Sequence, residues 1–202
     1  RSDIDMSLQA AEPIAAIEQE LGARAYYFVL LRTEMYNPFS EASRRSIARL
    51  LELGHEVGLH LDASLYGNDT SALDEAAARE CAVLEAATGN AVTAISFHRP
   101  AKSLLGYPEP IAGRPLAYQP KFFEQMGYCS DSRGAWEHGH PLQHEAVKAG
   151  RALQLLTHPI WWSPERAEPV QSRLDGFARS RYELLRQELG RNCTAYDPRR
   201  PG

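Results

Sequence analysis

The sequence predicts an α/β fold with a mostly parallel sheet, and three observations support this prediction. Segments with helical periodicity alternate with short apolar segments along the 202 residues. Apart from Arg24, residues 23–31 form a continuous apolar run with aromatic side chains, which is typical of a strand buried on both faces. Ionisable side chains follow several of the apolar segments, and parallel α/β folds place functional groups at that edge. Six or seven strands of this kind can close into a barrel or stay open.

The first elements alternate strand and helix. A strand ends at Asp5, and Ser7 is suited to cap a helix in which apolar residues recur at helical spacing. Gly22 ends that helix, because glycine readily adopts the left-handed conformation of a helix end. The buried strand 23–31 follows, and Ser40 caps a second helix.

The next strand, 54–62, alternates apolar and other residues with a period of two. Gly54 stops the preceding helix, and Gly58 allows another group to approach the backbone closely. A third helix begins at Ser71 and ends at Gly89. A further strand over 92–97 continues the alternation.

The second half of the chain has weaker periodicity. Residues 101–118 are rich in proline and glycine, and a loop of that length in a compact domain is more often functional than not. A short helix over 120–126 and strands over 128–131 and 153–157 follow. A last helix covers roughly 170–189.

Length, charge and cysteine content limit the classes of function that this chain can have. The length suits one domain, expected over 1–190 with a tail over 191–202. The net charge is −4 and the basic residues are scattered, which argues against binding to nucleic acid. The longest apolar run is too short to span a membrane. The three cysteines have neither metal-ligand spacing nor an even number, which favours a reducing compartment.

Five of the predicted strands carry ionisable side chains at or just after their carboxyl ends. These side chains are Asp3, Asp5, His60, Asp62, His98, Arg99, Asp131 and His158. Solvation of loops explains any one of them, and an isolated Asp3-x-Asp5 is most simply a turn that caps the first helix. The collective pattern is harder to explain in that way, because the carboxyl ends of parallel strands meet at one face. We therefore expect a site there, with His60 as a metal ligand and His55 as a structural residue.

Three tryptophans allow two interpretations. Trp136, Trp161 and Trp162 belong either to the core or to a wall of the substrate site. The pair Trp161-Trp162 follows closely after the strand-end His158, which favours the wall, because indole faces stack on sugar rings.

The order of the motifs resembles the polysaccharide deacetylase superfamily, the NodB-type enzymes of carbohydrate esterase family 4 and their relatives. The matching segments are Ser2-Asp3-Ile4-Asp5, Gly54 to His60 (GHExGxH), Arg99-Pro100, Asp131 with Trp136, and Leu156-Thr157-His158. The resemblance implies a distorted (β/α) barrel of about six to seven mostly parallel strands. It also implies a divalent metal, most commonly zinc, and hydrolysis of an N-acetyl group. The implied substrate is an N-acetylated sugar, a nucleotide sugar or a polysaccharide, as in a small branch of surface-polysaccharide or O-antigen synthesis in the bacterial cytoplasm.

Residue roles follow from the resemblance. Asp3 is the expected general base and Asp5 a metal ligand, although their separation by one residue leaves an exchange of roles open. The family has a second metal histidine four residues after the first, where this chain has Ser64, so His98 is the expected replacement.

The remaining catalytic roles fall to three further residues. His158 is the expected general acid. Arg99 is expected to hold Asp3, and Asp131 to orient Arg99 or His158.

Two other classes of function stay open. One is a non-catalytic barrel that binds a glycan or a protein partner, favoured by the serine at position 64. The other is a glycosyltransferase that uses Asp3-x-Asp5 to hold a metal and a nucleotide sugar. That fold needs a nucleotide-binding segment before the two aspartates, so this alternative ranks below the first.

Overall fold

The computed structural model describes residues 1–136, 139–162 and 168–200. The chain divides into two compact units, Arg1–Pro164 and Glu165–Gly202. The expected single domain over 1–190 with a tail over 191–202 stays a prediction. The polar strand ends all belong to the first unit.

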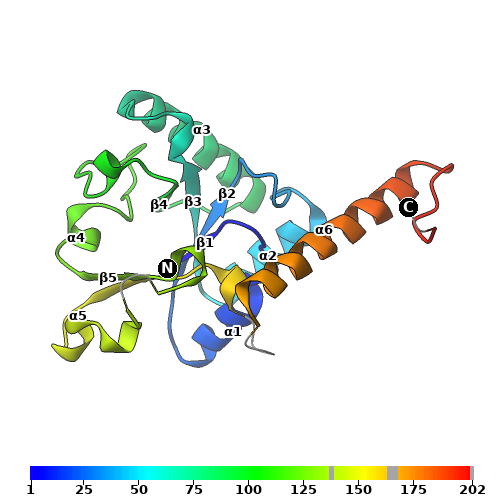
Figure 1. Cartoon of the computed structure of the whole chain (residues 1–202). Coiled ribbons are helices and arrows are strands. Elements are labelled where there is room, and N and C mark those ends of the chain that lie inside the picture. Colours follow the sequence, from blue (N-terminus) through cyan, green and yellow to red (C-terminus); the bar gives the residue numbers. More distant parts are fainter. Residues whose placement is uncertain (137–138, 163–167, 201–202) are drawn as a thin grey trace. The chain divides into compact units, whose positions relative to one another are not determined.

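Four parallel strands form the centre of the first unit (Figure 1). They are β1 (Ser2–Ile4), β2 (Tyr26–Leu30), β3 (Glu56–Asp62) and β4 (Ile95–His98), and they lie in that order. Nearly every residue of β2 and β3 is buried, because helices and loops cover both faces of the sheet.

A second parallel pair, β5 (Gly127–Ser130) and β6 (Leu153–Leu156), continues the sheet beyond β1. Ser2 and Thr157 form a parallel bridge, in which the Asp3 N–H donates to the Thr157 carbonyl at 2.9 Å. The sheet therefore runs from β5 and β6 through β1 to β4.

The opposite edge of the sheet curls back toward β6. Ile95 of β4 bridges to Leu116 in parallel fashion. The Gln154 side chain of β6 donates to the Ala117 carbonyl at 3.1 Å, which ties the segment beside β4 to β6. The fold is thus α/β with a curled parallel sheet that closes about half of a barrel, which confirms the predicted α/β class and parallel sheet.

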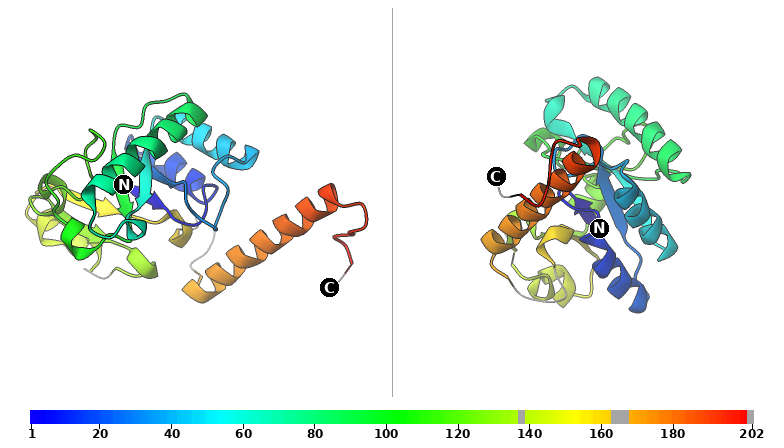
Figure 2. Two further views of the ribbon diagram at one scale, coloured as in Figure 1. Left: turned by 90° about the horizontal axis from the view of Figure 1, so that it is seen from above. Right: turned by 90° about the vertical axis from the view of Figure 1, so that its right-hand side faces the viewer.

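Three helices line one side of the four central strands (Figure 2). They are α1 (Ala11–Glu20), α2 (Glu41–Glu52) and α3 (Thr70–Thr88). Ser40 caps α2 as expected, since its hydroxyl accepts the Ser43 N–H. Asp69 caps α3 in place of the expected Ser71, because its carboxylate reaches the Ala72 N–H at 3.0 Å.

The remaining helices are two single turns and one long helix. The single turns are α4 (Pro120–Phe123) and α5 (Glu145–Lys148). The long helix, α6 (Val170–Asn192), belongs to the second unit and has no buried residue. No helix in the described ranges is long and apolar enough to cross a membrane.

Gly58 of β3 is closely packed against β2. It pairs with Phe28 in the sheet, and a Cβ atom on Gly58 would lie 2.5 Å from the Phe28 ring. The same Cβ atom would lie 2.9 Å from the Ala94 carbonyl oxygen, which belongs to the backbone and cannot swing away. The close approach expected at this glycine is therefore made by an aromatic ring.

We expect Gly58→Ala to lower the free energy of unfolding by about 1–3 kcal/mol, the usual cost of overpacking a core. Urea unfolding followed by circular dichroism measures this loss. Gly176→Ala is the control, because a Cβ atom there meets no atom within 4 Å. Equal stabilities of Gly58→Ala and the wild type would contradict the packing described.

Candidate active site

Six polar side chains converge where β1, β3, β4, β5 and β6 end. They are Asp3, Asp5, His60, His98, Asp131 and His158. Each comes from the carboxyl end of its strand or from the one or two residues after it. The parallel direction of the strands brings these residues together although they lie far apart in the chain.

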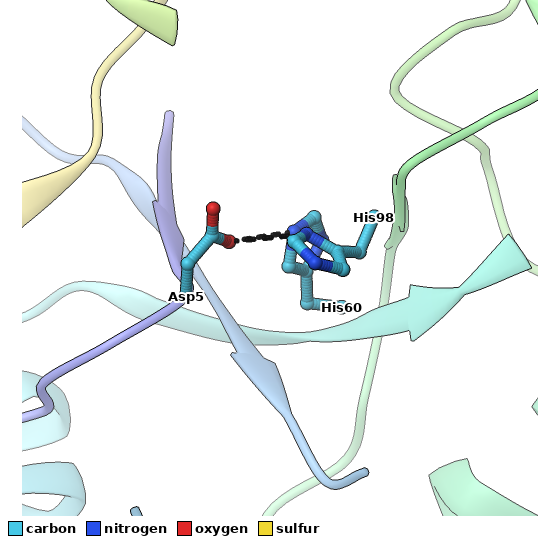
Figure 3. Close-up of side chains that lie close together, drawn as sticks. All are labelled: Asp5, His60 and His98. Carbon is cyan, nitrogen blue, oxygen red and sulfur yellow. Dashed lines mark ion pairs between the residues drawn. The ribbon is translucent and has the colours of Figure 1, made fainter. Parts of the chain in front are cut away.

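Asp5, His60 and His98 form a compact group with metal-ligand chemistry (Figure 3). The Asp5 Oδ1 atom lies 3.1 Å from His60 Nε2 and 3.4 Å from His98 Nδ1. One candidate ligand atom from each residue lies within 4.8 Å of the others. Zinc bonds of about 2.0–2.1 Å at tetrahedral angles place ligand atoms about 3.3 Å apart, so these separations suit such an ion.

The Asp5 Oδ1 atom is buried and accepts no hydrogen bond from the described residues. The two imidazole nitrogens are near it, but their directions do not meet the requirements of hydrogen bonds. A buried carboxylate oxygen without a donor is costly unless a ligand completes it. The group therefore fits a divalent cation.

The His60 ring has a defined tautomer. Its Nδ1 atom lies 3.2 Å from the Ser96 carbonyl oxygen, which can only accept a hydrogen bond. Nδ1 therefore carries a proton and donates it, and Nε2 is the ring nitrogen that faces Asp5. Metal-binding histidines are commonly oriented by such a backbone hydrogen bond.

Asp5 is held in its charged form. Burial alone would raise the pKa of its carboxyl group, but the neighbouring imidazoles of His60 and His98 bring that pKa well below its usual value. The charge of His158 acts in the same direction. An ionised Asp5 is the state that a metal ligand requires.

Ser64 does not join this group. Its hydroxyl donates to the Asp62 carboxylate at 2.6 Å, and its backbone N–H donates to the same oxygen at 3.1 Å. Both bonds hold Ser64 in the short 3₁₀ turn that follows β3. The third potential ligand atom beside Asp5 and His60 belongs to His98.

His158 and Asp131 form a second pair beside Asp5. The Nδ1–H group of His158 donates to Asp131 Oδ1 at 2.6 Å, and the His158 backbone N–H donates to Oδ2 at 3.1 Å. The indole N–H of Trp162 also donates to Oδ2, at 2.7 Å. The other ring nitrogen, Nε2, lies 3.7 Å from Asp5 Oδ2, so it points to the centre of the site.

The surroundings of His158 favour its protonated form. Burial alone would lower the pKa of the imidazole, but the hydrogen bond to Asp131 raises it above its ordinary value. The charges of Asp3 and Asp5 also raise this pKa. The ring can thus carry a proton toward the centre of the site near neutral pH.

Asp3 is buried against Arg1 and Ser96. The guanidinium of Arg1 lies 3.3 Å from Asp3 Oδ2, and the Ser96 hydroxyl donates to the same oxygen at 3.0 Å. Sequence reasoning assigned no role to Arg1 or Ser96. Only Arg1 could have been found from the sequence. Side chains two positions apart in a strand share a face, so Arg1 lies on the same face as Asp3.

The structure does not place Arg99 against Asp3, which corrects our expectation. Its side chain is 67% exposed, and Nη1 lies 3.9 Å from the Asp62 carboxylate. Arg99 has a backbone φ of +51°, so the chain turns sharply just after His98 and carries the guanidinium outward. Arg1 holds the place beside Asp3 instead.

Two of the three tryptophans lie near each other. The rings of Trp136 and Trp162 are 5.7 Å apart between centroids and tilted by 54°. Trp162 is 43% exposed although its indole N–H is bonded to Asp131. Trp161 is partly buried, and its indole N–H has no hydrogen-bond partner among the described residues.

His55 lies outside the site and has a structural role, as expected. Its Nδ1 atom accepts the Ala25 N–H at 3.2 Å, and its Nε2–H group donates to the Ala15 carbonyl at 2.9 Å. Both ring nitrogens are therefore satisfied by backbone groups, and the ring is buried.

No family model and no curated protein match this chain. Among solved structures, it is similar to a family 4 carbohydrate esterase from Bacillus anthracis, with 16% identity, a TM-score of 0.49, and coverage of 89% of this chain and 74% of that one. A family 4 acetyl xylan esterase from Clostridium thermocellum, in complex with a cobalt ion, has 14% identity and a TM-score of 0.43 over 91% of this chain and 83% of that one.

A third similar structure is a mutant of a family 4 pseudoenzyme from Bacillus anthracis with restored enzymatic activity. It has 14% identity and a TM-score of 0.46, and the match covers 89% of this chain but 61% of that one. This chain thus spans less than two thirds of that structure. All three likenesses concern the fold.

Proposed function

We propose that this chain is a metal-dependent deacetylase that hydrolyses an N-acetyl amide on a sugar or sugar-like substrate. The observation that carries the proposal is the position of the Asp5, His60 and His98 group. The buried carboxylate of Asp3 lies 3.9 Å from His60 of this group, and the hydrogen-bonded His158 lies 3.7 Å from Asp5. A ligand set, a base and an acid in contact with one another are the parts that metal-assisted amide hydrolysis needs.

The metal site would consist of Asp5, His60 and His98. One carboxylate oxygen and two imidazole nitrogens suit zinc and leave a coordination position open. When bound, such an ion polarises a carbonyl group and lowers the pKa of water to about 7. The preference for zinc over other divalent ions is part of the proposal.

Asp3 would act as the general base. Its Oδ2 atom is engaged by Arg1 and Ser96, whereas Oδ1 is buried and free of partners among the described residues. The free oxygen accepts a proton from the attacking water as the new carbon–oxygen bond forms.

His158 would act as the general acid. Its Nε2–H group gives a proton to the amide nitrogen while the carbon–nitrogen bond breaks. Asp131 keeps the ring in the required tautomer and orientation through Nδ1. The products are acetate and a free amine.

The tryptophans would line the substrate site. The partly exposed ring of Trp162 lies beside that of Trp136 and is anchored to the same Asp131 that orients His158. Indole faces stack on the apolar faces of sugar rings, so this pair, with Trp161 next in the chain, suits a sugar. We further propose that the substrate is an N-acetylated sugar, nucleotide sugar or polysaccharide of bacterial surface-polysaccharide or O-antigen synthesis, acted on in the cytoplasm.

Acetate release tests the proposal. We expect the protein loaded with zinc or cobalt to release acetate from one class in a panel of N-acetylated monosaccharides, nucleotide sugars and oligosaccharides. Asp3→Asn should lower the rate of that release by about 10²–10⁴-fold, the range typical of lost general-base catalysis, while it retains the metal. Glycan binding without acetate release from any member of the panel would favour the non-catalytic barrel. Transfer of a sugar from a nucleotide sugar would favour the glycosyltransferase.

A further inference from the structure

We infer that Arg1 and Ser96 are positioning residues that fix the carboxylate of Asp3 for proton transfer. The inference rests on the proposed function, in which Asp3 is the base. It differs from the expected arrangement, in which the arginine of the Arg99-Pro100 pair holds this carboxylate.

Both residues bind the same oxygen of Asp3. Arg1 Nη2 lies 3.3 Å and Ser96 Oγ 3.0 Å from Asp3 Oδ2. The side chains of Arg1 and Asp3 are only 5% and 2% exposed. Removal of one partner from a buried pair leaves the other charge without compensation, which is costly. The contact with Arg1 therefore holds the Asp3 carboxylate in place.

Arg1 is itself held in place. Its guanidinium stacks on the Tyr118 ring, with the central carbon 4.6 Å from the ring centroid. The Gln154 side-chain oxygen lies 3.5 Å from Nη1, and Gln154 is anchored by the Ala117 and Phe122 carbonyls. The end of the long 101–118 loop thus supports the arginine. Burial would lower the pKa of the guanidinium, but the charge of Asp3 raises it, so the guanidinium keeps its positive charge.

Ser96 connects the base to a metal ligand. Its hydroxyl donates to Asp3, and its carbonyl oxygen accepts the proton on His60 Nδ1. Ser96 and His60 are direct neighbours in the β3–β4 register. One buried residue therefore determines the position of Asp3 relative to His60, whose Nε2 atom lies 3.9 Å from Asp3 Oδ2.

The bonds at Oδ2 leave the other carboxylate oxygen unused. Asp3 Oδ1 is buried and has no hydrogen-bond partner among the described residues. A buried acceptor without a donor is rare and points to a ligand or water that is present during function. Arg1 and Ser96 thus select which oxygen of Asp3 is available to accept a proton.

A double-mutant cycle tests the inference. We expect Arg1→Gln and Ser96→Ala each to lower kcat about 10–100-fold with little change in KM, since small displacements of catalytic groups have effects of this size. Arg1→Lys should restore part of the rate because it keeps the positive charge. Metal content should stay at the wild-type level, because the Ser96 carbonyl still accepts the hydrogen bond from His60 Nδ1.

The decisive comparison is made in the Asp3→Asn background. If Arg1 and Ser96 act through Asp3, their substitution causes no further loss there. Equal losses in both backgrounds would overturn the inference. Arg24→Gln is the matched control, because Arg24 also pairs with a carboxylate of the sheet, Glu56 at 2.9 Å, but on the exposed surface.

Crystal structures of Arg1→Gln and Ser96→Ala give a result that does not depend on activity. We expect the Asp3 carboxylate to rotate or shift in both variants. An Asp3 side chain unmoved in both would overturn the inference. If the wild type releases no acetate, the proposed function fails, and these structures alone decide whether Arg1 and Ser96 fix Asp3.

Discussion

His158→Ala is expected to lower kcat for acetate release by about 10²–10⁴-fold, the range typical of a lost general acid. KM should change little, because the imidazole acts on the leaving nitrogen as the bond breaks and contributes little to substrate binding. The physical reason is the placement of Nε2, 3.7 Å from Asp5 Oδ2 at the centre of the site. Initial rates of acetate release over a range of substrate concentrations give both constants.

Asp131→Asn should lower kcat nearly as much. An amide in place of the carboxylate cannot accept all three hydrogen bonds that Asp131 now accepts. The double variant should be no worse than either single one, because the two residues act as a unit. His144→Ala is the control: that ring caps α5 through the Ala146 N–H and lies outside the group of six side chains. If His158→Ala has the same kcat as the wild type, His158 is not the general acid.

His98→Ala is expected to weaken divalent metal binding by more than about 100-fold. Changes in groups that only orient a ligand already cost about 10–100-fold, so loss of a ligand should cost more. Metal content after dialysis and the shift in melting temperature on adding zinc measure this effect. Neither readout requires a known substrate.

Ser64→Ala is the matched control for His98→Ala. Position 64 is where the resemblance places a second metal histidine, yet the Ser64 hydroxyl is bonded to Asp62 in this structure. We therefore expect the metal content of Ser64→Ala to equal that of the wild type. If Ser64→Ala loses metal and His98→Ala retains it, His98 is not the third ligand.

Most of the sheet could be predicted from local pattern. The buried strands around Phe28 and Leu59 have continuous or alternating apolar residues, and pattern of this kind depends only on nearby positions. Helix ends were less certain: Ser71 and Asp69 are both suitable caps, and the packing of the turn before α3 decides between them. The curl of the sheet depends on contacts such as that between Gln154 and Ala117, which join distant parts of the chain.

The arginine beside Asp3 shows why the site could be predicted only in part. Two arginines flank the strands of the site: Arg1 precedes β1 and Arg99 follows β4. The motif resemblance favours Arg99 as the partner of Asp3. The backbone turn at Arg99, with φ at +51°, sends its side chain outward, and no local pattern reveals that turn. Ser96 escaped notice for a similar reason, because a buried serine in a strand has no signal of its own.

By itself, the sequence determined the strand ends and therefore the identity of the converging groups at Asp5, His60 and His158. It could do so because residues at the carboxyl ends of parallel strands must share one edge of the sheet. Only the tertiary structure decided that His98 joins the group while Ser64 turns to Asp62, and that Arg1 holds Asp3. Those choices depend on side-chain directions and on contacts between strands, which sequence spacing does not specify.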